Sequence, residues 1–280
     1  MSTVQTLPNK PNKVEVVTTS SVKIILNAER EIAYSSPDHV MPWGTRRDNS
    51  RNRRFNEKLY RLFPQKGEPL KILDLGCSGG AFVKDCLDDG CLAVGLEGSD
   101  YSKKHRRAEW ATIPDFLFTC DITYDFELLL DTSPGKRRIQ FDIITSWELI
   151  EHIAEADLAK VAENVRKHLL PSGLWIMSVS LNEQIIGGVK LHQTVKSKEW
   201  WIRKFAELHF THLESHVQYF NTQFVRGPKY GAPGSFHFVL STDISKVPNV
   251  PSQKITDVAY DKWLGSKLQV LLRRWLIGVI

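Results

Sequence analysis

The chain has 280 residues, of which 42% are hydrophobic and 25% charged, and this composition predicts a soluble globular protein with a sizeable core. A formal net charge of +5 permits an anionic partner but requires none. Its four cysteines form no CxxC pair, which excludes a disulfide framework and indicates reduced thiols in the cytoplasm. Neither a signal peptide nor an apolar run of about 18 residues is present, so we expect no membrane-spanning segment.

The first 65 residues are polar and contain loop-forming prolines, and they predict a cap or lid ahead of the main domain. A short helix is expected over residues 55–63. Five arginines crowd the stretch around the start of this helix, Arg46, Arg47, Arg51, Arg53 and Arg54. They favour either a lid that grips an anionic acceptor or a solvated loop, and the sequence leaves both interpretations open.

From residue 71, short apolar runs alternate with helical patterns, which is typical of βαβ units and a parallel sheet. We therefore predict an α/β protein with a Rossmann-like, mostly parallel sheet and helices on both faces. The expected strands are 71–75, 92–97, 116–119, 141–147 and 174–180. The expected helices are 81–89, 102–111, 155–170 and 197–208.

After residue 210 the pattern favours two further strands, 212–220 and 235–241, which predict a terminal antiparallel hairpin. The main domain is thus expected to span residues 66–245. Residues 246–280 are expected to form a linker and an amphipathic helix. This helix docks on the core or on a second subunit, or alternatively makes peripheral contact with a membrane surface.

A glycine turn, "LDLGCSGG" at residues 73–80, ends the first of these strands and opens a helix. Glycines here let the backbone approach a ligand closely at a helix N-terminus, as nucleotide sites require. The dinucleotide fingerprint GxGxxG needs glycines at positions 76, 78 and 81. Ser78 and Ala81 occupy two of those positions, which argues against hydride transfer. A tight strand-to-helix connection is the simpler alternative.

Two more carboxylates end the next two strands of the predicted sheet. Glu97 stands where a carboxylate can accept both ribose hydroxyls of a nucleoside, and Asp121 follows the third strand. Each carboxylate alone is also explained as a helix N-cap. Together with Asp74, however, they favour a ligand at the C-terminal edge of the sheet.

These motifs resemble those of class I S-adenosylmethionine-dependent methyltransferases over residues 70–241. The first family motif, (D/E)xGxGxG, is matched by Asp74, Gly76 and Gly80, and Ser78 replaces the middle glycine. The resemblance implies that Glu97 binds the ribose and Asp121 the adenine amine. The implied cofactor-binding residues are Asp74, Gly76, Cys77, Ser78, Gly80, Glu97, Gly98, Ser99, Asp121, Ile122 and Trp147.

The stretch "ITSWELIEHI" at residues 144–153 places Glu148, Glu151 and His152 just after the fourth strand. At helical spacing these side chains share one face, so we expect them to converge. The stretch resembles the ExxEH of ubiquinone-biosynthesis O-methyltransferases, with related sugar methyltransferases, and of small-RNA 3′-terminal 2′-O-methyltransferases. With His192, the resemblance implies a site for Mg²⁺, Mn²⁺, Fe²⁺ or Zn²⁺.

Methyl transfer from a sulfonium is an in-line displacement, so alignment and removal of the acceptor's proton are the main tasks. A bound metal would lower the pKa of an acceptor hydroxyl. Without a metal, His152 or His192 is the expected general base, and Glu151 completes the predicted catalytic set. A structural or hydrogen-bonding role for the histidine is the alternative.

We therefore predict a cytoplasmic S-adenosylmethionine-dependent O-methyltransferase that acts on a saccharide or another hydroxyl-rich small molecule. The oligomeric state is left open. The first rival is an RNA 3′-terminal 2′-O-methyltransferase whose arginines neutralise phosphates, although the scattered basic residues argue against nucleic acid. The second rival is a non-catalytic binding protein with the same fold.

Overall fold

The computed structural model describes residues 23–64, 67–132, 135–228, 232 and 234–262. Its centre is a seven-stranded sheet in the order β11-β12-β8-β7-β2-β3-β4. The inner strands β8, β7, β2, β3 and β4 are parallel, β12 runs antiparallel to β8, and β11 runs antiparallel to β12. Their bounds are β2 Lys71–Leu75, β3 Leu92–Glu97, β4 Leu117–Thr119, β7 Phe141–Trp147, β8 Leu169–Val179, β11 Thr211–His212 and β12 Phe236–Ser241. The predicted α/β fold with a mostly parallel sheet is confirmed.

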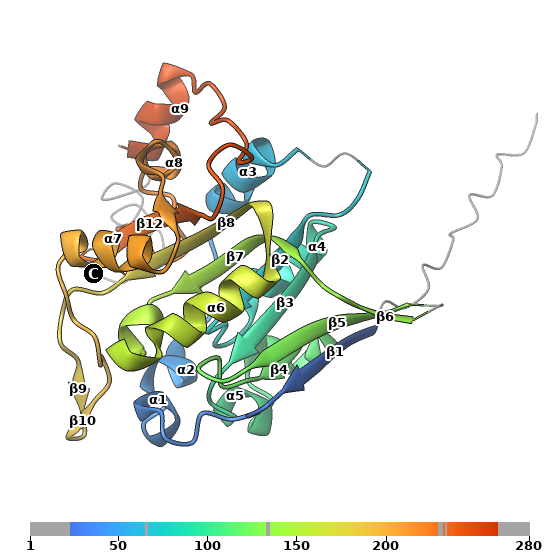
Figure 1. Ribbon diagram of the computed structural model, residues 1–280, viewed down its shortest axis with the longest axis vertical. Coiled ribbons are helices and arrows are strands. Elements are labelled where there is room, and N and C mark those ends of the chain that lie inside the picture. Colours follow the sequence, from blue (N-terminus) through green and yellow to red (C-terminus); the bar gives the residue numbers. More distant parts are fainter. Residues whose placement is uncertain (1–22, 65–66, 133–134, 229–231, 233, 263–280) are drawn as a thin grey trace, which may run out of the picture.

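Helices cover both faces of this sheet (Figure 1). Because side chains alternate along a strand, Leu73 and Leu75 join one core cluster while Ile72 joins the other. The first cluster includes α6 (Leu158–His168) and α7 (Lys198–Glu207). The second includes α3 (Arg53–Leu62), α4 (Ala81–Asp88) and α8 (Glu214–Phe220). Burial on both faces explains why the parallel strands are apolar without alternation.

The predicted strand over residues 212–220 is wrong, because most of this segment forms helix α8. Only residues 211–212 pair with β12. The buried side chains that follow are His216, Tyr219 and Phe220, which have helical spacing. The end of the sheet is therefore a β11–α8–β12 unit rather than a hairpin.

The predicted helix over residues 102–111 is also wrong in extent. The chain forms a short helix α5 (Tyr101–Lys104) and then a separate 3-10 turn over Ala108–Ala111. Arg106 lies between these two pieces and Ala108 begins the second, and their φ values are 46° and 48°. A left-handed backbone interrupts a right-handed helix, so one continuous helix cannot form here.

A second, antiparallel sheet was not predicted from the sequence pattern. It has the order β1-β5-β6, with β1 Lys23–Ala28, β5 Phe126–Thr132 and β6 Gly135–Arg138. Ile24, Phe126 and Leu128 are buried in the same core cluster as helix α6. Residues 23–28 of the predicted N-terminal cap therefore belong to the core.

The remaining elements are short and lie mostly in connections. They are α1 Pro37–Val40, α2 Trp43–Arg47, β9 Ile185–Ile186, β10 Val189–Lys190 and α9 Ile255–Ala259, with 3-10 turns at Pro114–Phe116, Ile150–His152 and Glu155–Asp157. Most of the predicted C-terminal helix lies outside the described residues. Among the helices of the described segments, none is both long enough and apolar enough to cross a bilayer.

Candidate active site

A cavity of about 750 Å³ opens along the C-terminal ends of β3, β4, β7 and β8. Helices α1 and α2 and the loop after β8 complete its wall. Its volume falls within the roughly 300–1,000 Å³ that is usual for small-molecule sites. The predicted site residues that line it are Gly76, Ser78, Glu97, Gly98, Ser99, Asp121, Ile122, Trp147, Glu148, His152 and His192. Most of the predicted site is therefore brought together at one edge of the sheet.

The glycine turn has the backbone conformation that its sequence predicts. Gly76 and Gly80 have φ values of 71° and 87°, in the left-handed region that favours glycine. Ser78 also has a positive φ, 48°, and its hydroxyl donates to the carbonyl of Asp48 at 2.9 Å. The serine that replaces the family's middle glycine is thus held by a side-chain hydrogen bond.

Glu97 is buried at the end of β3 and bridges the glycine turn to the next loop. Its carboxylate accepts from the backbone N–H of Ser78 at 2.8 Å and of Ser99 at 3.3 Å. Burial raises its pKa, and these two N–H groups oppose that shift. A carboxylate has about four acceptor positions, and the long contact from the Thr45 hydroxyl, at 3.4 Å, is a third contact that a ligand's hydroxyl could replace.

Asp74, Cys77 and Gly80 do not line the cavity, although they were predicted to contact the cofactor. Asp74 is buried between β2 and β7, where its carboxyl accepts from the Thr145 hydroxyl at 2.6 Å. Burial raises the pKa of Asp74 to about 8. Its observed contact therefore joins two central strands beneath the glycine turn.

Asp121 lies at the start of the loop after β4 and lines the cavity. Its Oδ1 accepts from the backbone and hydroxyl of Thr123, at 3.1 and 2.6 Å. Its Oδ2 is 3.7 Å from the guanidinium of Arg30. Trp147 also lines the cavity, but its ring packs edge-on against Phe55 with a centroid distance of 5.2 Å.

The N-terminal segment covers the glycine turn through backbone and side-chain contacts. The Thr45 hydroxyl donates to Glu97 at 3.4 Å, and Asn49 accepts from the N–H of Ala81 at 3.0 Å. A Cβ at Gly79 would lie 2.2 Å from Asn49, so this close approach requires glycine.

The five N-terminal arginines are divided among several partners. Arg51, Arg53 and Arg54 form ion pairs with Asp85, Asp89 and Asp261 at 3.3, 2.9 and 2.8 Å. Arg46 faces the ring of Tyr101 at 5.6 Å. Arg47 lines the cavity and stacks on Trp43 at 3.3 Å. Three of the arginines therefore hold the cap to the rest of the protein rather than face an acceptor.

Three of the four predicted metal ligands, Glu151, His152 and His192, lie close together at the other end of the cavity, although Glu151 does not itself line it. One potential ligand atom from each lies within 4.8 Å of the others. The loop carrying His192 is fixed to this place because the N–H groups of Gln193 and Thr194 donate to the Glu151 carbonyl, at 2.8 and 2.9 Å. The two imidazole rings meet edge-on with a centroid distance of 4.6 Å. We call Glu151, His152 and His192 the imidazole cluster.

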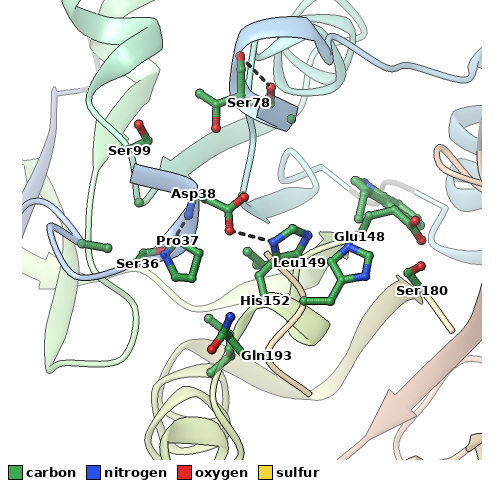
Figure 2. Close-up of a pocket in the computed structure, with 18 of the residues that line it drawn as sticks. Ser36, Pro37, Asp38, Ser78, Ser99, Glu148, Leu149, His152, Ser180 and Gln193 are labelled. Atoms are coloured by element: carbon green, nitrogen blue, oxygen red, sulfur yellow. Dashed lines mark hydrogen bonds and ion pairs between the residues drawn. The ribbon is translucent and has the colours of Figure 1, made fainter. Parts of the chain in front are cut away.

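The Nδ1 atoms of both imidazoles lie beside an oxygen atom. His152 Nδ1 lies 2.7 Å from the carboxylate of Asp38, a residue that the sequence analysis did not identify (Figure 2). His192 Nδ1 donates to the carbonyl of Asn182. Burial lowers the pKa of His152, but the carboxylates of Asp38, Glu151 and Glu148 together outweigh it, and the net pKa is raised. Burial and the neighbouring His152 lower the pKa of His192, so its Nε2 is available as a base or ligand.

The two glutamates do not lie on one helical face with His152, contrary to the prediction. Glu148 has a φ of 50° and precedes the 3-10 turn, so one regular helical face does not hold all three side chains. Its carboxyl lines the cavity but is outside the group of close ligand atoms. Glu151 is fully buried, and its Oε1 accepts from the N–H of Ser180 at 2.7 Å.

The donor set fits a divalent cation. Glu148 Oε1 and Glu151 Oε2 are buried and have no hydrogen-bond partner among the described residues. Burial, and then the charge of Glu148, raise the pKa of Glu151. Either a proton or a cation would satisfy these oxygens, and two carboxylates with two imidazoles are ligands that divalent metals accept.

Comparison with known proteins identifies the family. A family model described as a methyltransferase domain matches residues 47–226. The chain belongs to this methyltransferase domain family. The match begins at the last residue of α2, so the cavity wall formed by α1 and the rest of α2 lies outside it.

Curated relatives of this methyltransferase domain are distant. The ubiquinone biosynthesis O-methyltransferase of Bartonella quintana is 28% identical over 108 residues, which cover 37% of this chain and 38% of that protein. The small RNA 2′-O-methyltransferase of Mus musculus is 27% identical over 157 residues, 51% of this chain and 40% of that protein. The chain thus spans less than half the length of these relatives.

Solved structures also resemble this methyltransferase domain. The glycopeptide N-methyltransferase MtfA complexed with S-adenosyl-L-methionine aligns with a TM-score of 0.45 and 16% identity, over 67% of this chain and 92% of that chain.

Proposed function

We propose that the protein is an S-adenosylmethionine-dependent O-methyltransferase acting on a hydroxyl of a saccharide or another hydroxyl-rich small molecule, with a divalent metal ion in the imidazole cluster. One observation carries the proposal. The same cavity has Glu97 and Asp121 at one end and His152 and His192 at the other. A nucleoside cofactor and an acceptor hydroxyl bound there would meet in one enclosed space.

At the cofactor end, Glu97 and Asp121 supply acceptors for the ribose hydroxyls and the adenine amine. The Glu97 carboxylate is already fixed by two backbone N–H groups, so it needs no rearrangement to receive a ribose. Ile122 and Leu96 provide apolar wall beside these carboxylates. This arrangement suits a neutral, hydroxyl-bearing nucleoside.

At the imidazole end, His192 is the residue suited to accept the proton of the acceptor hydroxyl. Its Nδ1 donates to Asn182, which leaves the lone pair of Nε2 free to take a proton. Its lowered pKa keeps the ring neutral at pH 7. Methyl transfer then requires that the hydroxyl oxygen lie in line with the sulfonium methyl group.

A metal ion would be held by Glu151, His152 and His192, with Glu148 within the same cavity. When bound, such an ion lowers the pKa of a coordinated hydroxyl and orients its oxygen. Glu151 remains in place in either case because the N–H of Ser180 fixes one of its oxygens.

The charges around the cavity favour a neutral acceptor over a polyanion. Its wall carries the carboxylates of Asp38, Asp48, Glu97, Asp121, Glu148, Asp157 and Glu183. The guanidinium groups in the wall are those of Arg47 and Arg226, and Arg226 is paired with Asp48 at 3.3 Å. The amides of Asn182, Gln184 and Gln193 lie near the imidazoles and suit hydroxyl groups.

Methyl transfer from tritiated S-adenosylmethionine to a panel of monosaccharides, methyl glycosides and catechols tests this function. Each acceptor is assayed with and without Mg²⁺ or Mn²⁺, and after treatment with a chelator. We expect methyl transfer to a neutral polyol, and we expect the chelator to suppress this transfer. S-adenosylhomocysteine binding without transfer to any hydroxyl compound would contradict the O-methyltransferase assignment.

RNA 2′-O-methylation is the second candidate, because a small RNA 2′-O-methyltransferase is among the relatives. The acidic cavity wall argues against it, since RNA phosphates would meet mostly carboxylates. A gel shift with a short single-stranded RNA at low salt separates the two. Binding together with methylation of the 3′ end would favour the RNA substrate.

A further inference from the structure

We propose that Asp38 is a positioning residue for methyl transfer, which holds the imidazole of His152 by its Nδ1 and leaves its Nε2 for the reaction. The proposal rests on the methyl-transfer function above. Asp38 comes from helix α1 and precedes the region matched by the family model, residues 47–226. Neither the family match nor the motifs of the sequence therefore assign a role to it.

The contact between Asp38 and His152 is close and sheltered. Asp38 Oδ2 lies 2.7 Å from His152 Nδ1, and the side chains are 22% and 13% exposed. The contact is an ion pair, because Nδ1 has no partner in hydrogen-bond geometry among the described residues. The two groups come from α1 and from the turn after β7, more than 100 positions apart in the chain. Figure 2 shows the carboxylate of Asp38 directed at the ring of His152. Because both side chains are mostly buried, water only partly replaces Asp38 as the partner of Nδ1.

A neutral imidazole has two tautomers of similar energy, so a partner is needed to select one of them. A neutral ring carries its proton on Nδ1 or on Nε2, and the partner of one nitrogen decides the state of the other. When the ring is neutral, a carboxylate beside Nδ1 keeps the proton there, which frees the Nε2 lone pair. His192 is held in the same state by the Asn182 carbonyl. Both rings of the imidazole cluster therefore have Nδ1 engaged.

The segment around Asp38 is itself well anchored. The Ser36 hydroxyl caps α1 by accepting from the N–H of Asp38 at 3.3 Å, and Pro37 occupies the first helical position. The N–H of Ala33 donates to the carbonyl of Gly98 at 2.9 Å, in the loop that follows Glu97. The strand end that holds Glu97 and the ring of His152 are thus connected through residues 33–38.

The test compares Asp38→Ala and Asp38→Asn with the unchanged full-length protein. The matched control is Glu214→Gln, because Glu214 lies 3.2 Å from His212 Nε2 and neither residue lines the cavity. For a partner that orients a functional histidine, Asp38→Ala is expected to lower kcat about 10- to 100-fold. Asp38→Asn should lose less, because its amide oxygen still accepts from Nδ1. The KM for S-adenosylmethionine should stay within about twofold in all variants, since the cofactor carboxylates are untouched.

A second readout needs no turnover. In protein with ¹⁵N-labelled histidine and no added metal, the His152 signals are assigned by their loss in His152→Gln. At an alkaline pH, where the ring is neutral, we expect the Nδ1-protonated ring in the unchanged protein and a mixture of tautomers in Asp38→Ala. The Glu214→Gln control should leave the His152 signals unchanged.

The two readouts separate this proposal from the function on which it rests. If no acceptor is methylated by the unchanged protein, the proposed function fails and the nitrogen signals still test Asp38. A His152 tautomer that does not respond to Asp38→Ala would overturn the positioning role, and so would a kcat within twofold of the unchanged protein.

Discussion

The two ends of the cavity are built in different ways. At the cofactor end, Glu97 and the glycine turn lie on neighbouring strands and are already hydrogen-bonded to each other. At the imidazole end, the contributing residues come from α1, from the turn after β7 and from the loop after β8. Glu148 Oε1 and Glu151 Oε2 there lack partners among the described residues. The first end is thus complete in itself, whereas the second has buried polar atoms that a ligand would satisfy.

Removing the imidazole cluster should have the largest effect and separate the two ends most clearly. Glu151→Gln with His152→Gln keeps the side-chain sizes similar but removes the charge and the ring. We expect kcat to fall on the order of 10³-fold, the range of a lost general base or metal site. Calorimetry with S-adenosylhomocysteine should show affinity within a few-fold. A loss of cofactor affinity would mean that the two ends are not independent, and His212→Gln serves as the distant control.

Changing Glu97 should have the opposite effect and weaken cofactor binding. Glu97→Ala removes the acceptor of two ribose hydroxyls, and hydrogen bonds to a charged group contribute about 1.5–3 kcal/mol each. We therefore expect the Kd for S-adenosylhomocysteine to rise about 10²- to 10⁴-fold. Circular dichroism checks that the fold survives the loss of the contacts to Ser78 and Ser99. An unchanged Kd would remove Glu97 from the cofactor site.

The core residue His168 sharpens the comparison, because both of its ring nitrogens have hydrogen-bond partners without any ligand. His168 Nδ1 donates to the Asn164 carbonyl at 2.8 Å, and Nε2 accepts from the N–H of Leu128 at 3.3 Å. Burial lowers its pKa from 6.5 to about 4. The unfolded chain therefore takes up a proton first, so this contribution to stability is full above pH 6.5 and is lost as the pH falls towards 4.

Between pH 7.5 and pH 5 this one group should lower the free energy of unfolding by about 2 kcal/mol. Urea unfolding at the two pH values measures the loss, and His168→Gln should reduce the difference by that amount. If the variant keeps the whole pH dependence, groups other than this core imidazole control acid stability.

Restoring the family's middle glycine should have the smallest effect. In Ser78→Gly the left-handed backbone is relaxed, but the hydrogen bond to the Asp48 carbonyl is lost. The relief of backbone strain and the loss of the hydrogen bond each change the free energy by about 1 kcal/mol, in opposite directions. The Kd for S-adenosylhomocysteine should change less than about threefold. A larger change would show that the Ser78 hydroxyl takes part in cofactor binding.

The sequence predicted the inner sheet and the conformation of the glycine turn closely, because both depend on local patterns. Apolar runs define β2, β3 and β7, and the glycines at 76 and 80 require a left-handed backbone wherever the strand turns into a helix. Segment 212–220 was misassigned because its apolar residues fit both a strand and a helix. The pairing of β1 with β5 was not predictable, because partners about 100 residues apart leave no local signal.

The sequence by itself determined that Glu97, Asp121, Glu148 and His152 end strands of one parallel sheet and hence face one edge. Only the tertiary structure decided that Asp38 approaches His152, that His192 is held beside Glu151 and that Asp74 lies beneath the cavity wall. The physical reason is the range of the interactions. Strand periodicity and glycine conformation are properties of a few consecutive residues. Contacts between distant segments depend on how the cap and the loops pack, and no short stretch of sequence encodes that packing.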